Sequence, residues 1–138
     1  METSHSGKCQ CGAVRYKIIG EPITAHACHC KDCQKRSGSA FGLSLVFRTD
    51  AFTFTGELES YRRIADSGFR LTQYFCPKCG NTIFSENERR ENAIVLHPGT
   101  LDDTKWFKLN RLIWTSRAQS WCPLPEGFEM FKESQPFE

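Results

Sequence analysis

Three cysteines stand within six positions of one another, at Cys28, Cys30 and Cys33. Thiols this close together are typical ligands of a soft metal ion, and zinc is the ion that such ligands hold most often. Three protein ligands leave zinc a fourth position for water or a substrate, which is the arrangement of catalytic rather than structural zinc. The cluster therefore predicts a catalytic zinc site with an open coordination position.

The spacing of Cys30 and Cys33 also fits a short helix that begins at Cys30. Residues three apart lie on one helical face, and a helix N-terminus favours thiolate over thiol. Two other interpretations stay open: a redox dithiol made by Cys30 and Cys33, or a metal site closed by a fourth protein ligand. The candidates for that fourth ligand are His26, His29, His97 and Cys122.

A second cysteine cluster is predicted from two pairs that are far apart in the chain. Cys76 and Cys79 have two residues between them and are followed by Gly80, which is the pattern of a zinc knuckle. A knuckle supplies two of the four ligands that structural zinc needs, and Cys9 with Cys11 is the natural second pair. We therefore expect a structural zinc held by Cys9, Cys11, Cys76 and Cys79. The alternative is a set of buried free cysteines.

Composition and charge exclude several classes of protein. The chain has 138 residues and a net charge of +2, too mild for the clustered basic surface that binds nucleic acid. It has no run of about 18 apolar residues, so we expect no membrane span. The first seven residues lack the apolar core of a signal peptide, so we expect the protein in the reducing cytoplasm. There, clustered cysteines indicate metal ligands or reactive thiols rather than disulfides.

The elements that must position these cysteines are mostly short strands. Alternating or apolar segments followed by turn residues predict strands over residues 14–18, 41–48, 51–55, 69–75, 82–85, 93–97 and 112–114. Residues 58–64 are ambiguous, residues 1–8 read as a loose polar arm, and the chain from Cys122 onward reads as mostly irregular. A short helix over 32–36 would end at Gly38. The pattern predicts one mainly β domain over residues 1–138, with little helix.

At this point the sequence resembles a known family, the glutathione-dependent formaldehyde-activating enzymes, which also includes centromere-protein-V-like proteins. The resemblance extends over nearly the whole chain and is strongest at both cysteine clusters. It implies a mainly β, zinc-stabilised "β-tent" fold with two zinc ions, one structural with four cysteine ligands and one catalytic with three. It also implies carbon–sulfur lyase chemistry on glutathione adducts. The matching segments are residues 7–14, 28–35, 37–41, 75–80, 98–103 and 114–121.

The resemblance leads to a functional hypothesis, a zinc-dependent carbon–sulfur lyase that acts on glutathione or a related thiol adduct. Metal at the open site would favour the thiolate of the substrate, and the cations Lys31, Lys35 and Arg36 could attract its carboxylates. His97 is a candidate proton shuttle, although a histidine at a strand end is more often structural. The alternative function is a zinc-stabilised module that binds glutathione or a protein without turnover. Neither function involves nucleic acid or a membrane.

Overall fold

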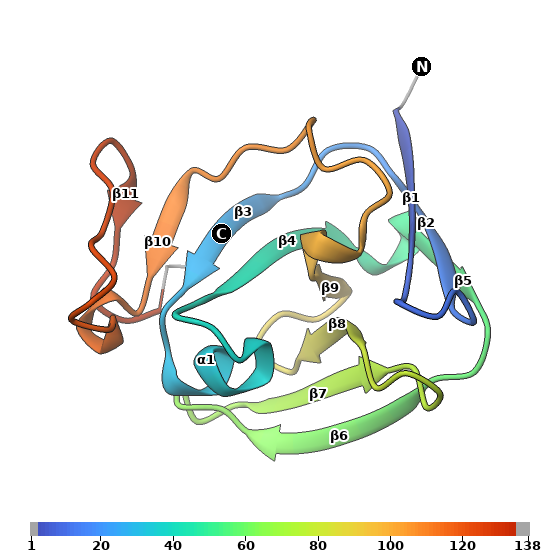
Figure 1. Cartoon of the computed structure of the whole chain (residues 1–138), viewed down its shortest axis with the longest axis horizontal. Helices are drawn as coiled ribbons and strands as arrows, with labels where there is room; N and C mark the ends of the chain where they lie inside the picture. The colour runs from blue at the N-terminus through green and yellow to red at the C-terminus, as the bar shows by residue number, and fades with distance from the viewer. Residues whose placement is uncertain (1–2, 135–138) are drawn as a thin grey trace.

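The computed structural model describes residues 3–134, and it consists mainly of two β-sheets (Figure 1). The smaller sheet has three antiparallel strands in the order β1-β2-β5. These are β1 (Ser4–Lys8), β2 (Arg15–Ile19) and β5 (Phe52–Thr55). Among the described residues, α1 (Lys31–Ser37) is the one α-helix, and no helix is long and apolar enough to cross a bilayer. Three short 3₁₀ turns are η1 (Thr49–Ala51), η2 (Pro98–Thr100) and η3 (Thr115–Arg117).

The larger sheet has eight strands in the order β11-β10-β3-β4-β9-β8-β7-β6. It curves strongly, so that β6 and β7 lie across from β3 and β10, with α1 beside the space between them (Figure 1). All its pairs are antiparallel except those of β10 with β3 and with β11. Its strands are β3 (Thr24–Cys28), β4 (Gly42–Arg48), β6 (Glu59–Ile64), β7 (Arg70–Phe75), β8 (Thr82–Asn87), β9 (Ala93–Leu96), β10 (Arg111–Ile113) and β11 (Glu129–Met130).

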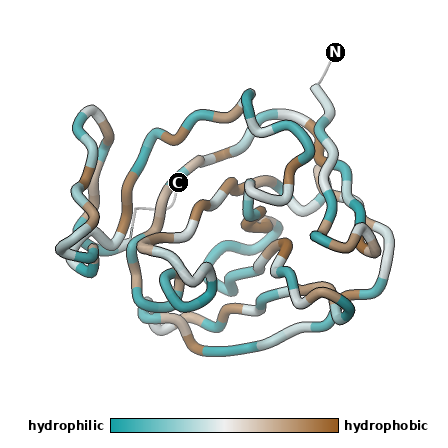
Figure 2. Tube along the Cα trace, viewed as in Figure 1, coloured by the Kyte–Doolittle hydropathy of each residue, from teal (hydrophilic) through white to brown (hydrophobic). Residues whose placement is uncertain are grey.

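The two faces of the large sheet have different surroundings. Successive side chains of a strand point to opposite faces. Leu45 and Phe47 of β4 therefore pack into the hydrophobic core together with Ile18 of the small sheet. Ser44 and Val46, the alternate residues of the same strand, line a cavity on the other face. The edge strand β6, in contrast, is largely hydrophilic (Figure 2).

The expectation of a mainly β fold with little helix is confirmed, and α1 is capped as predicted. Gly38 ends the helix in the left-handed conformation with a φ of 65°, which glycine adopts without a steric cost. The expectation of a loose arm over residues 1–8 is wrong from Ser4 onward, because β1 pairs with β2 along its whole length. Strand β3 was not predicted either, since its five residues are all buried and show no alternation.

Gly7 is the residue that lets β1 approach its neighbours closely. A Cβ atom at Gly7 would lie 2.2 Å from the hydroxyl oxygen of Tyr16 and 2.5 Å from the carbonyl oxygen of Thr100. Tyr16 could not move aside freely, because its hydroxyl lies 2.7 Å from Oγ1 of Thr100 in a hydrogen bond. The close approach of β1 therefore requires the absence of a side chain.

We expect Gly7→Ala to lower the free energy of unfolding by about 1–3 kcal/mol, because overpacking forces the neighbouring atoms apart. Urea denaturation measures the change. The matched control is Gly99→Ala, since a Cβ there would meet nothing within 4 Å and the backbone has no positive φ. Equal stability losses in the two variants would contradict this interpretation.

Candidate metal centres and cavity

The two turns of the four-cysteine cluster present their thiols to one point. The sulfur atoms of Cys9, Cys11, Cys76 and Cys79 all lie within 4.8 Å of one another. In each turn a glycine has a positive φ, 80° at Gly12 and 75° at Gly80. Backbone hydrogen bonds close both turns, from Cys9 N–H to Val14 oxygen and from Gly80 N–H to Cys76 oxygen. The cluster joins the connection between β1 and β2 to the connection between β7 and β8.

The electrostatics of this cluster suit a dication. Burial raises the pKa of the Cys9 thiol, but the N–H of Val14, 3.3 Å from the sulfur, and the neighbouring thiols outweigh burial and lower the pKa to about 6. At Cys11 a backbone hydrogen bond with Ala13 is outweighed by burial and the adjacent thiols, which raise the pKa to about 11. One thiolate thus opposes the ionisation of the next, and a bound cation would relieve this repulsion.

The three-cysteine cluster is built where β3 enters α1. Cys28 ends the strand, Cys30 is the N-cap of the helix, and Cys33 lies in its first turn. Their sulfur atoms lie within 4.8 Å of one another. The sulfur of Cys30 accepts a hydrogen bond from the Cys33 N–H at 3.4 Å, so the helix begins at a thiol as the spacing indicates. The same side chain therefore caps the helix and belongs to the cluster.

Charge within the three-cysteine cluster is concentrated on Cys33. Hydrogen bonds from Cys28 and Cys30 hold the pKa of Cys33 well below its usual range, and the nearby Arg36 guanidinium adds to this effect against burial. Hydrogen bonds with Cys30 and Cys33, followed by burial and the negative charge of those neighbours, hold the pKa of Cys28 well above its usual range. As in the four-cysteine cluster, one thiol ionises readily. Ionisation of the other thiols would require a bound cation to offset the repulsion between thiolates.

No fourth protein ligand joins the three-cysteine cluster within residues 3–134. The described histidines, carboxylates and remaining cysteines all lie outside the 4.8 Å group. His26 instead contacts the Thr24 hydroxyl at 3.4 Å, His29 packs against the ring of Phe41, and Cys122 is a free thiol. The arrangement fits a metal with three protein ligands and one open position, and the donor set suits zinc.

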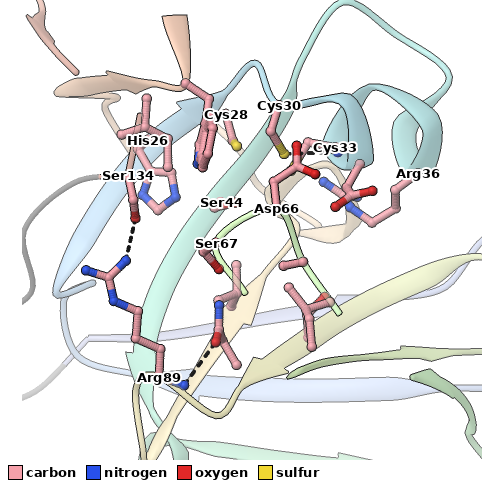
Figure 3. Close-up of a pocket in the computed structure, with 18 of the residues that line it drawn as sticks. His26, Cys28, Cys30, Cys33, Arg36, Ser44, Asp66, Ser67, Arg89 and Ser134 are labelled. Atoms are coloured by element: carbon pink, nitrogen blue, oxygen red, sulfur yellow. Dashed lines mark hydrogen bonds between the residues drawn. The ribbon is translucent and has the colours of Figure 1, made fainter. Parts of the chain in front are cut away.

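A cavity opens next to the three thiols, between the curved sheet and α1 (Figure 3). Arg36 lines it from α1, whereas Lys31 and Lys35 are exposed on the helix and do not line it. Arg63 from β6 also reaches the wall, where its Nη1 pairs with the Asp32 carboxylate at 2.7 Å. The floor is formed by residues of five strands, which are His26, Cys28, Ser44, Val46, Ser85, Asn87, Val95 and Ile113.

His97, which follows β9, and Ser85 form a hydrogen-bonded pair in the cavity wall. The Nδ1 atom of His97 lies 3.3 Å from the Leu43 carbonyl oxygen, and its Nε2 lies 3.2 Å from the Ser85 hydroxyl. A carbonyl oxygen only accepts, so the proton of the neutral ring is on Nδ1 and the Ser85 hydroxyl donates to Nε2. Burial, then the charge of Arg36, lowers the pKa of His97 to about 3, which keeps the ring neutral.

Sequence reasoning missed Ser44, Ser85 and Arg63 as cavity residues. The available signal was the period of two along the strands, since Ser44 precedes the core residue Leu45, and Ser85 follows the buried Phe84. That signal shows which side of a strand a residue is on, but not which residues lie across the cavity from it. The residues that share the cavity come from strands separated by tens of residues in the sequence. The cysteines were found because their spacing is local.

The fold and the two cysteine clusters define a mainly β protein with two candidate metal centres. A family model described as "Glutathione-dependent formaldehyde-activating enzyme" matches residues 4–117, which include both clusters. The chain therefore belongs to the glutathione-dependent formaldehyde-activating enzyme family, as the resemblance of its motifs implies.

One curated protein and one solved structure are similar to this chain. A Penicillium rubens protein named "Putative glutathione-dependent formaldehyde-activating enzyme" is 31% identical over 84 residues, which are 59% of this chain and 44% of that protein. The chain thus spans less than half the length of this curated relative. A crystal structure of a Rhodobacter sphaeroides protein aligns with a TM-score of 0.56 at 19% identity, over 70% of this chain and 87% of that one. This likeness concerns the fold alone.

The two clusters are expected to differ in what they do for stability. We expect two zinc ions in the wild type, one in Cys76→Ser and one in Cys30→Ser, by elemental analysis of purified protein. Structural zinc contributes ~10–16 kcal/mol in zinc-finger peptides, so Cys76→Ser should lower Tm by more than about 10 °C. Cys30→Ser should lower it much less, because the open cluster joins residues that are already close in the chain.

Cys122→Ser is the control for this experiment, since Cys122 belongs to neither cluster. Its zinc content and Tm should equal those of the wild type. A wild type that binds one zinc, or a Cys76→Ser variant that keeps two, would contradict the assignment.

His97 should make stability depend on pH. Its pKa is about 3 in the folded protein and ~6.5 in an unfolded chain. As the pH falls below about 6.5, the unfolded chain takes up a proton that the folded protein does not, so the free energy of unfolding decreases. His97→Asn should reduce this slope by up to about 1.4 kcal/mol per pH unit.

Urea denaturation of both proteins at several values between pH 4 and pH 7 measures the two slopes. Metal loss at low pH affects wild type and variant alike, so the difference between their curves reports on His97. Parallel curves would show that His97 is not held neutral by the fold.

Proposed function

We propose that this protein is a zinc-dependent carbon–sulfur lyase that acts on glutathione or related thiol adducts of formaldehyde. The observation that carries the proposal is the placement of three thiols, within 4.8 Å of one another, in the wall of a cavity. Cys28, Cys30 and Cys33 would hold the catalytic zinc. The cluster of Cys9, Cys11, Cys76 and Cys79 would hold the structural zinc. The family to which the chain belongs supports a role in glutathione-related formaldehyde activation.

The reaction joins a thiol to an aldehyde, or separates them. A thiol has a pKa near ~8.5, so only a small part of it is thiolate at neutral pH. Zinc at the open site would supply the missing ionisation by favouring the bound thiolate. The protein's own residues would position the adduct. Arg63, Arg89 and Arg90 in the wall give the cavity positive charge, which attracts the carboxylates of glutathione.

The Ser85–His97 pair offers a defined hydrogen-bonding group to the substrate. Because the Ser85 hydroxyl donates to His97, its remaining lone pairs can accept a hydrogen bond from the hydroxyl of a hydroxymethyl adduct. His97 would orient Ser85 and would stay neutral while doing so. In this proposal His97 is a positioning residue, and the proton shuttle considered from the sequence is not required.

The chemistry of the cysteines also supports the cytoplasm as the place of action. All eight cysteines of the chain are free, seven of them in the two clusters and the eighth at Cys122. Thiols in this form persist in a reducing compartment, whereas an oxidising one would favour disulfides within each cluster. We therefore keep glutathione, the abundant small thiol of that compartment, as the proposed partner.

NMR exchange spectroscopy of glutathione with formaldehyde, with and without zinc-loaded protein, tests the proposal. We expect the wild type to accelerate formation and breakdown of S-(hydroxymethyl)glutathione above the spontaneous rate. Cys30→Ser should abolish the acceleration, because it removes a ligand of the open site, whereas Cys122→Ser should retain it. No acceleration by a protein that contains both zinc ions would overturn the lyase and favour a glutathione-binding module without turnover.

A further inference from the structure

Arg36 places a cationic guanidinium, partly hydrogen-bonded to Cys33, beside the three thiols. Its Nη2 atom has no hydrogen-bond partner among the described residues 3–134, although it is shielded from solvent. A buried donor without a partner destabilises the fold, and does so more when it is charged. Arg36 lines the cavity next to the cysteines and also an adjoining groove that contains Asn81 and Thr100. An unsatisfied group in this position indicates that a ligand supplies its acceptor.

Gly42 is the residue that makes room for this guanidinium. It lies opposite Cys28 in the pairing of β3 with β4. A Cβ atom at Gly42 would lie 2.3 Å from Nη2 of Arg36 and 3.1 Å from Cβ of Cys33. The backbone of Gly42 has no positive φ, so space and not conformation requires the glycine. The guanidinium is therefore held against the backbone of β4, next to the first turn of α1.

The chemistry of the proposed reaction requires a cationic donor at such a place. When a thiolate sulfur bonds to the carbonyl carbon of an aldehyde, the C=O electron pair moves to the oxygen, which becomes an alkoxide. Donors preorganised toward that oxygen stabilise the transition state. Three thiolates around a divalent cation leave the site with a net negative charge, which makes the metal a weak electrophile for the oxygen. The positive charge has to come from another group, and Arg36 is beside the thiols.

We propose that Arg36 donates a hydrogen bond to the aldehyde-derived oxygen of the adduct, and that Gly42 maintains the space for this contact. This inference rests on the proposed lyase function and assigns a catalytic residue to it. In the addition direction the C–S bond forms, the oxygen gains the electron pair, and a proton from solvent neutralises it. Breakdown reverses these steps. Arg36 stays protonated throughout, because its side chain does not lose its proton in proteins.

The experiment separates two roles for Arg36 by using two ligands. Glutathione alone has carboxylates but no aldehyde-derived oxygen, whereas its formaldehyde adduct has both. For Arg36→Gln we expect the exchange rate at saturating substrate to fall about 10²–10³-fold, the cost of losing one such donor. The Kd of glutathione alone, measured by calorimetry, should stay within about twofold. Lys35→Gln, an exposed cation on the same helix, is the matched control and should alter neither quantity.

Gly42→Ala is the second variant, because it displaces the guanidinium without removing it. We expect at least a tenfold slower exchange with zinc content unchanged. The double variant should be no slower than Arg36→Gln alone, since both changes remove the same contact. This variant tests the contact even where Arg36→Gln weakens zinc binding through the lost charge.

Normal exchange in both variants would overturn the inference while leaving the lyase intact. A weaker Kd for glutathione with an unchanged exchange rate would also overturn it, and would identify Arg36 as a carboxylate anchor. A wild type that does not accelerate exchange would instead overturn the proposed function itself, which the wild-type measurement shows before any variant is made.

Discussion

The alternation of side chains across the large sheet is the constraint on which the rest of the molecule depends. Both faces of β4, β8 and β9 are covered, one by the hydrophobic core and the other by the cavity. A shift of one residue in register would exchange Leu45 for Ser44 and move the cavity lining into the core. The packing that stabilises the sheet therefore also fixes the positions of the hydroxyl and imidazole groups around the thiols.

The two cysteine clusters contribute to this arrangement in different ways. The cluster at Cys9 and Cys76 ties the small sheet to the β7–β8 connection, so its four donors serve to join separate parts of the chain. The cluster at Cys28 and Cys33 lies within one strand-to-helix connection that is also held by Gln34. The Gln34 amide donates to the carbonyl oxygens of His29 and Arg117, at 2.7 and 3.0 Å. The geometry of the three-cysteine cluster is thus supported by hydrogen bonds of Gln34 as well as by the thiols themselves.

Features that depend on residues close together in the sequence could be predicted, whereas features that depend on distant residues could not. The knuckle at Cys76 and the capped helix at Cys30 are local patterns, and both were predicted with their glycines. Strand β3 was missed because a strand buried on both faces loses its alternation. The close approach of the Arg36 guanidinium to Gly42 could not be predicted, because it depends on how a helix packs against a strand.

The spacing of the cysteines along the chain has a consequence for the order of assembly. Cys11 and Cys76 are 65 residues apart, whereas Cys28 and Cys33 are five apart. Closing the longer loop costs more chain entropy, and it requires the β7–β8 connection to have formed. The short cluster can therefore gather its thiols earlier, even on a nascent chain. A metal ion captured there first would start the helix at Cys30, and the long-range cluster would then close last and lock the two sheets together.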